Sequence, residues 1–207
     1  KLALLQAGLR ALPLLDGVPF KDELLAIAPT VQIATAVAGL IGVLCSVMVY
    51  VATRRAQWSG ARTGIKFFGT TTLLGAAAVF AVSQVGTPAG LVTGTSTLLW
   101  FVIGASLVKL SFEAAGLLAA RQRQNTVFKR MARVTLGDLR HVTTLRFLFG
   151  LLGGVALPCL LLATPTNPAV LAVLGLGVLG CVLMGEAAER YLFFRAAPAS
   201  RMPGGLK

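Results

Sequence analysis

VAGLIGVLCSVMVYVA, residues Val37–Ala52, contains no charged side chain, and the apolar stretch extends upstream to Thr30 without one. A helix needs about 20 predominantly apolar residues to cross a bilayer core of about 30 Å. Four more predominantly apolar stretches of about this length follow along the chain, at residues 65–85, 91–120, 143–163 and 169–194. The sequence therefore predicts an all-α fold, a polytopic transmembrane helix bundle with about five spans.

The composition of the whole chain agrees with a membrane protein. Of the 207 residues, 56% are hydrophobic and only 13% are charged, and the mean hydropathy is +0.82. A soluble domain needs more polar surface than this, so the composition excludes the soluble class. The net charge of +12 would suggest nucleic-acid binding in a soluble protein. Here the charges fall between the apolar runs, where they set the membrane topology.

The first residues differ from the rest of the chain. LALLQAGLRALPLL, residues 2–15, is too short to span a bilayer, and DGVPFKDE, residues 16–23, reads as a turn with balanced charge. We expect residues 1–27 to be the end of an upstream helix plus an extracytoplasmic loop, with an interfacial amphipathic helix as the alternative. Residues 28–194 form the bundle, and residues 195–207 form a basic cytoplasmic tail. Since the chain begins with Lys1, we also expect residues upstream.

Basic residues alternate with uncharged turns along the chain. The loops at residues 53–66 and 121–142 and the C-terminal tail are basic, whereas the turns GTPAG (86–90) and TPTNP (164–168) carry no charge. Five spans therefore place all basic loops on one face, which the positive-inside rule assigns to the cytoplasm. Sixteen of the nineteen basic residues fall on this face: Arg54, Arg55, Arg62, Lys66, Lys109, Arg121, Arg123, Lys129, Arg130, Arg133, Arg140, Arg146, Arg190, Arg195, Arg201 and Lys207.

Ionisable residues near the basic ends of the spans are candidate site residues, because charges at membrane depth are costly and mark functional sites. They are Lys109, Glu113, Arg146, Glu186, Glu189 and Arg190. Lys109 and Glu113 lie four residues apart and can pair along one helix face, and Glu186 and Arg190 repeat that spacing. One reading is that these side chains snorkel to the interface or tie helix ends together. The other reading is that they form a polar pocket that binds a quinone headgroup or passes protons, with Glu113 or Glu186 as the proton acceptor.

Cofactor ligands within the chain are not expected. Cys45, Cys159 and Cys181 each stand alone in an apolar run, without the paired spacing of zinc or iron–sulfur sites. The single histidine, His141, lies in a basic loop, whereas membrane b-type haem is held by histidines within helices. We therefore predict no metal site, no haem and no catalytic centre of the soluble type.

Glycines are frequent in the fourth and fifth spans, where they predict close helix packing, at Gly150, Gly153, Gly154, Gly175, Gly177 and Gly180.

Most aromatic residues gather near the basic face, where an interfacial belt explains them. They are Tyr50, Trp58, Phe67, Phe68, Tyr191, Phe193 and Phe194.

Two segments resemble the membrane-anchor subunit of dimethyl sulfoxide reductase-type complexes. They are VMVYVATRRAQWSGARTGIKFFGTTTLLG, Val47–Gly75, and GEAAERYLFF, Gly185–Phe194. In that family the last helix carries a similar Gly-Glu, an Arg four residues after the Glu, and a pair of aromatics. Gly185, Glu186, Arg190, Phe193 and Phe194 occupy the matching positions, and Arg146 looks like an arginine that the family places early in the preceding span. The chain resembles the C-terminal five of about eight helices.

The resemblance implies a function in electron transfer. Such an anchor holds no haem, exchanges electrons with quinone, either ubiquinone or menaquinone, and docks a ferredoxin-like iron–sulfur subunit that serves a molybdopterin catalytic subunit. Iron–sulfur clusters and molybdopterin then belong only to the partner subunits. The residues expected to bind quinone or transfer protons are Glu186, Arg190, Glu113, Lys109 and Arg146.

The resemblance also implies a docking face in the bacterial inner membrane. In the best-known family member the loop matching residues 53–66 lies outside, whereas its strongly basic character here predicts that it lies inside, with cytoplasmic partners. A basic face also attracts acidic electron-transfer subunits, which is the alternative explanation of the charge if the docked face is periplasmic. The residues expected to dock the partner are Arg54, Arg55, Trp58, Arg62, Arg130, Arg133 and His141.

Two other functions remain as alternatives. A secondary transporter, or a fragment of one, predicts inverted repeats and broken helices with polar residues at the midplane, but the charges here lie at helix ends. A purely structural anchor is the second alternative, if the quinone site lies wholly in helices upstream.

Overall fold

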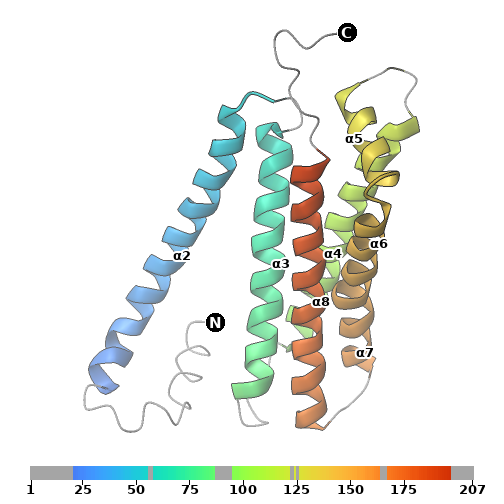
Figure 1. The fold of residues 1–207 in the computed structure, drawn as a ribbon. Helices are drawn as coiled ribbons and strands as arrows, with labels where there is room; N and C mark the ends of the chain where they lie inside the picture. The colour runs from blue at the N-terminus through green and yellow to red at the C-terminus, as the bar shows by residue number, and fades with distance from the viewer. Residues whose placement is uncertain are drawn as a thin grey trace.

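The computed structural model describes residues 21–55, 58–86, 95–121, 124, 126–163 and 167–196, and the regular structure in this part of the chain is helical. Five helices are long and apolar enough to cross a membrane, which confirms the expected number of spans and the all-α class. The elements are α2 (Lys21–Ala52), α3 (Gly60–Gly86), α4 (Thr95–Leu117), η3 (Leu118–Arg121), α5 (Val127–Leu136), α6 (Arg140–Leu151), the π-helical η4 (Leu152–Ala156), α7 (Leu157–Ala163) and α8 (Pro168–Arg195) (Figure 1).

The helices run alongside one another, and the basic loops lie at one end. The end of α2, the start of α3, α5 and the end of α8 lie together at the top of Figure 1. We call this end, formed by residues 53–55, 58–70, 109–121, 124, 126–146 and 186–196, the basic end. The end of α3 and the starts of α4 and α8 lie at the opposite end. The alternation predicted from the loop charges is therefore present in the fold.

Two boundaries differ from the sequence expectations. Helix α2 begins at Lys21, so the last three residues of the expected turn are helical, and residues 1–20 lie outside the described part. The loop expected at residues 121–142 contains the short helix α5. Its first turn is capped by Thr126, whose side chain accepts a hydrogen bond from the Lys129 backbone nitrogen at 3.2 Å. Ala132 and Thr135 face inward, while Arg130 and Arg133 are exposed, so α5 is amphipathic.

The fourth span is interrupted by a π-helical turn, η4. Proline lacks a backbone N–H, so Pro158 cannot bond the carbonyl four residues earlier, that of Gly154. The backbone widens there instead, and the Leu157 N–H bonds the carbonyl of Leu152, five residues back. The sequence expectation of one continuous helix missed this interruption.

Glycines in η4 let two neighbouring helices approach closely. A Cβ on Gly153 would lie 2.8 Å from the backbone nitrogen of Val182 on α8, and one on Gly154 would lie 2.5 Å from the Ser106 Cβ on α4. Both positions therefore require glycine, as the sequence predicts. Gly180 does not follow the pattern, since a Cβ there would meet nothing within 4 Å.

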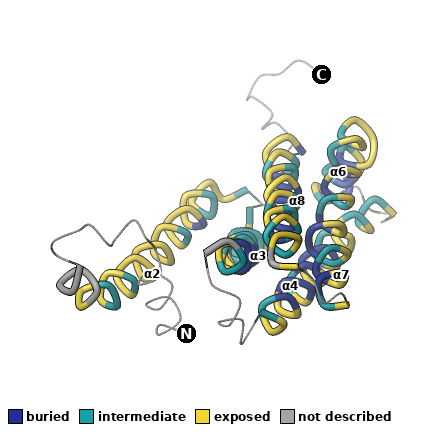
Figure 2. Tube along the Cα trace, turned by 90° about the horizontal axis from the view of Figure 1, so that it is seen from below, coloured by how far each residue is buried: buried dark blue, intermediate teal, exposed yellow. Residues whose placement is uncertain are grey.

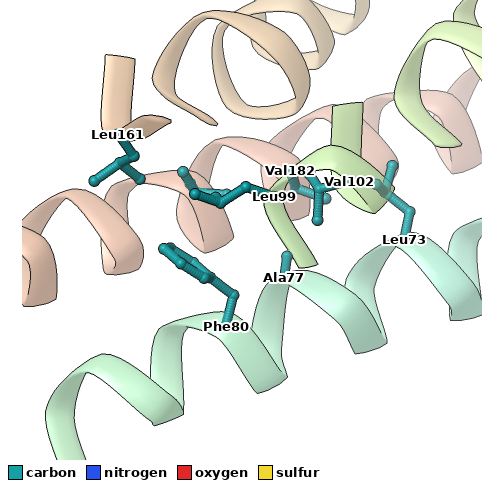
Figure 3. Packing of buried hydrophobic residues seen from close by; sticks show 8 residues of the cluster. Leu73, Ala77, Phe80, Leu99, Val102, Leu161 and Val182 are labelled. Carbon is teal, nitrogen blue, oxygen red and sulfur yellow. The ribbon is translucent and has the colours of Figure 1, made fainter. Parts of the chain in front are cut away.

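An apolar cluster fills the half of the bundle away from the basic end. Phe80 on α3 is fully buried and points between α4, α7 and α8 (Figure 3). This cluster, which we call the apolar half, comprises Leu73, Ala77, Phe80, Leu99, Val102, Leu161, Val178 and Val182. It joins the four helical segments α3, α4, α6–α7 and α8 into one packed unit.

Helix α2 stands apart from this unit. It leans away from α3, so that its start is far from the other helices while its end lies close to them (Figures 1 and 2). Of the most apolar 18-residue stretch of its span, only 6% is buried, against 28–33% in the other four spans. Near its C-terminal end, Val47 is buried and the Tyr50 ring contacts rings of α3 and α8.

Candidate functional site: a buried ion network and an aromatic cluster

Arg146 on α6 is the centre of the charges inside the basic end. Its guanidinium holds Glu113 of α4 with a bidentate pair of hydrogen bonds, Nε to Oε2 at 2.9 Å and Nη2 to Oε1 at 2.7 Å. The same Nη2 lies 3.1 Å from Oε1 of Glu186 on α8. Such a planar, two-pronged pairing is the geometry in which arginine binds carboxylates best. Arg146 therefore joins three helices at one point.

Lys109 and Lys66 continue the contacts toward the surface. The Lys109 ammonium on α4 contacts Glu186 Oε2 directly and lies 2.9 Å from Glu189 Oε2. Lys66, near the start of α3, lies 3.0 Å from the other oxygen of Glu189. We call the six residues Lys66, Lys109, Glu113, Arg146, Glu186 and Glu189 the ion network. It links all four helical segments of the packed unit.

The ion network is buried and balanced. Lys109, Glu113, Arg146, Glu186 and Glu189 expose 2–9% of their side chains, and Lys66 exposes 25%. Three cations face three carboxylates, so the network as a whole is neutral. An unpaired charge at this depth would cost several kcal/mol, and mutual pairing removes that cost. The first interpretation of these residues offered two possibilities, snorkelling to the interface or tying helix ends together, and the contacts show the second.

The pairing partners differ from those expected from sequence spacing. Glu113 pairs with Arg146 and not with Lys109, and Glu186 pairs with Lys109 and Arg146 and not with Arg190. The expected pairs along one helix face are therefore wrong. The i, i+4 rule describes pairs on the surface of a single helix. In a packed bundle the same side chains can face neighbouring helices and pair with residues there.

Glycines at the helix crossings make room for the network. A Cβ on Gly185 would lie 3.0 Å from Arg146 Nη1, and one on Gly150 would lie 3.3 Å from the same atom. The Gly185-Glu186 pair thus has a physical reason: the glycine admits the guanidinium and the glutamate binds it.

Thr70 on α3 is a junction that sequence reasoning missed. Its hydroxyl lies 2.6 Å from Glu186 Oε2 and 2.8 Å from the Lys66 carbonyl, and it accepts hydrogen bonds from Lys109 Nζ at 2.7 Å and Arg190 Nη2 at 3.0 Å. A hydroxyl has one hydrogen and two acceptor positions, so Thr70 is saturated. The only signal in the sequence is its place one turn after Lys66.

Arg190 lies at the edge of the ion network. Its guanidinium stacks 3.7 Å from the Phe67 ring, and its Nη2 donates to Thr70. Within the described part of the chain, no carboxylate pairs with it, and its buried Nη1 has no hydrogen-bond partner. Arg190 is therefore a cation in excess of the balanced network, with a free donor.

Aromatic rings pack together beside Arg190. Tyr50 contacts the rings of Trp58, Phe67, Phe193 and Phe194 at centroid distances of 5.3–5.8 Å. Trp58 stacks on Phe193 at 5.9 Å. We call these five residues the aromatic cluster. An interfacial belt predicts rings dispersed around the bundle, whereas these rings contact one another and join α2 to α3 and α8.

The aromatic cluster is surrounded by cations and holds a second free donor. Arg55 lies 5.0 Å from the Trp58 ring and Lys66 lies 5.6 Å from the Phe193 ring. The indole Nε1 of Trp58 is buried without a partner among the described residues. Because buried donors are normally satisfied, Trp58 Nε1 and Arg190 Nη1 indicate an acceptor that the described residues do not supply.

The interior of the bundle has little free space beside the ion network. A narrow crevice lies between the ion network and the apolar half, and it has no room for a water molecule. It is therefore too small for a quinone headgroup. It is lined by Leu73, Ser106, Leu110, Arg146, Gly150 and Val182.

The residues expected to dock a partner all lie at the basic end. Arg54, Arg62, Arg130, Arg133 and His141 are exposed, and Arg55 and Trp58 are half-buried. Arg62 on α3 lies 3.9 Å from the ring of Phe128 on α5, which fixes the short helix against the start of α3. The arrangement presents a broad cationic surface.

A family model described as the DMSO reductase anchor subunit (DmsC) matches residues 22–195, most of the chain. The chain belongs to this family. The resemblance carried by Val47–Gly75 and Gly185–Phe194 is thus confirmed, and the protein is a membrane anchor subunit of a DMSO reductase-type complex. No curated protein and no solved structure matches the chain.

Proposed function

We propose that this anchor subunit exchanges electrons between the quinone pool and a docked iron–sulfur subunit, which serves a molybdopterin catalytic subunit. The observation that carries the proposal is the pair of free buried donors, Arg190 Nη1 and Trp58 Nε1, beside stacked aromatic rings. A quinone, ubiquinone or menaquinone, is a flat ring with carbonyl acceptors. These residues fit such a headgroup.

Each residue of the site has a distinct role in this proposal. Arg190 and Trp58 donate hydrogen bonds to the headgroup oxygens, and the rings of Phe67 and Phe193 pack against its face. The bound quinol supplies electrons for the partner and protons for nearby carboxylates. Of these carboxylates, Glu186 is linked to Arg190 through Thr70.

The other candidate residues position these groups. Lys109 and Arg146 hold Glu186 from two sides, and Glu113 holds Arg146. Because their charged groups are already paired, they have little capacity to bind a headgroup directly. We therefore assign headgroup binding to Arg190 and a positioning role to Lys109, Arg146 and Glu113.

The partner subunit docks on the basic end in this proposal. Exposed cations there would attract an acidic iron–sulfur subunit and speed its association. The docking surface comprises Arg54, Arg55, Trp58, Arg62, Arg130, Arg133 and His141, which brings the partner close to the aromatic cluster. The positive-inside rule assigns this end to the cytoplasmic side of the bacterial inner membrane.

A transporter fits less well. The sequence contains no Asp, Glu, Lys, Arg or His from Phe67 to Val108 or from Phe147 to Gly185. Secondary transporters bind their substrates and ions near the midplane, where this chain has no charged group to offer.

Substituting Arg190 by Gln tests the quinone site. In the assembled complex we expect quinol-dependent turnover to fall roughly 10- to 100-fold, the cost of losing a charged hydrogen bond, while turnover with an artificial electron donor stays unchanged. Arg195→Gln is the matched control, since it removes an exposed arginine one turn later. Wild-type quinol kinetics in Arg190→Gln would contradict the assignment.

A further inference from the structure

The ion network has one exposed member. Contacts run from Glu186 to Lys109, from Lys109 to Glu189 at 2.9 Å and from Glu189 to Lys66 at 3.0 Å. Lys66 exposes 25% of its side chain, and the other three are nearly buried. Lys66 lies near the start of α3, next to the basic loop of residues 53–59. The chain of charged groups therefore meets water at the basic end.

The network is closed toward the opposite end. Beneath it lie Leu73, Leu110 and Val182, and then the rest of the apolar half, including the buried Phe80 and Val102. The spans carry no Asp, Glu, Lys, Arg or His in this half. No carboxylate, ammonium, guanidinium or imidazole is therefore present there to carry a proton toward the opposite end.

Thr70 connects the proposed headgroup site to the network. Arg190 Nη2 occupies one acceptor position of its hydroxyl, and the hydroxyl lies within hydrogen-bond distance of Glu186 Oε2. When the guanidinium turns toward a headgroup, that acceptor position becomes free. The Thr70 oxygen can then take a proton while its own hydrogen passes to Glu186.

We propose that protons of the quinone reaction travel through Thr70, Glu186, Lys109 and Glu189 to Lys66 and are exchanged only at the basic end. This inference rests on the proposed quinone function. For each quinol oxidised, two O–H bonds break, two electrons pass to the docked iron–sulfur subunit, and two protons are released on the basic side. Quinone reduction takes its protons from the same side.

The side of release is measured with the complete complex in proteoliposomes whose docked subunits face outward. A soluble quinol analogue is the donor, and ferricyanide, which binds no protons on reduction, is the external acceptor. We expect two protons to appear outside for each quinol oxidised, while a pH dye trapped inside records no change. Acidification of the interior would overturn the inference but leave the quinone function intact. Absence of any quinol oxidation would instead refute the proposed function.

Thr70 variants test the junction itself. Thr70→Val keeps the side-chain shape without the hydroxyl, and we expect quinol turnover to fall on the order of tenfold. Thr70→Ser restores the hydroxyl and should recover most of the activity, which assigns the effect to the hydroxyl and not to the shape of the side chain. Thr71→Val is the matched control, since its hydroxyl bonds only its own helix and is exposed. Equal rates in Thr70→Val and wild type, or no rescue by Ser, would overturn the role of Thr70.

Discussion

The same four helical segments are held together differently at their two ends. At the basic end, side chains from α3, α4, α6 and α8 form paired charges around Arg146 and Lys109. In the apolar half, Phe80 and its neighbours pack by shape alone. Apolar packing between membrane helices gains little from the hydrophobic effect, because lipid is equally apolar. The charges, in contrast, allow few arrangements, so the basic end fixes which helix faces meet.

The difference also separates structure from function. The spans of the apolar half carry no Asp, Glu, Lys, Arg or His to bind a charged ligand or to carry a proton. The basic end has both a balanced network and an unpaired cation, Arg190. We infer that the apolar half supports the bundle and that the chemistry of the subunit is confined to the basic end.

The largest expected effect comes from removing the central cation. Arg146→Met leaves Glu113 and Glu186 with fewer partners in a buried site, and breaking a buried pair costs about 3–5 kcal/mol. Unfolding in mild detergent, followed by circular dichroism, measures the loss. Arg140→Met is the control, because Arg140 is exposed at the start of the same helix. Equal stability of the two variants would contradict the idea that paired charges hold the helices together at the basic end.

A smaller effect is expected from a substitution that changes chemistry and not packing. Glu186→Gln keeps the side-chain volume but removes the proton acceptor, so quinol-dependent turnover should fall about 100-fold, while artificial-donor activity persists. Asp138→Asn, which neutralises an exposed carboxylate at the same end, serves as control. Unchanged quinol kinetics in Glu186→Gln would limit the basic end to a structural role.

The apolar half should respond least. Phe80→Ala opens a cavity whose own contribution is on the order of 2 kcal/mol, and it should leave the quinol kinetics of the folded complex unchanged. Phe101→Ala, on the exposed face of α4, is the comparison and should have little effect. A quinol defect in folded Phe80→Ala would mean that the two ends are coupled.

The sequence predicted the spans and the location of the charges, because apolar length and loop charge act locally. Glu113, Arg146, Glu186 and Arg190 all lie at the basic end, as expected. Their partners could not be predicted, because the rotation of each helix about its own axis decides which neighbouring helix a side chain such as Lys109 faces. The role of Thr70 depends on the same packing. The π-helical turn η4 had a signal in the sequence, Pro158 just after it, but a count of apolar residues does not take the proline into account.

The central claim, a quinone-linked anchor, is tested most directly by purifying the protein from native membranes in mild detergent. The partner chains are identified by mass spectrometry, and iron, molybdenum and quinol-dependent turnover are measured in the same sample. We predict that a ferredoxin-like subunit and a molybdopterin subunit copurify with both metals and with quinol activity. Recovery of this chain alone, free of iron and molybdenum, would contradict the account.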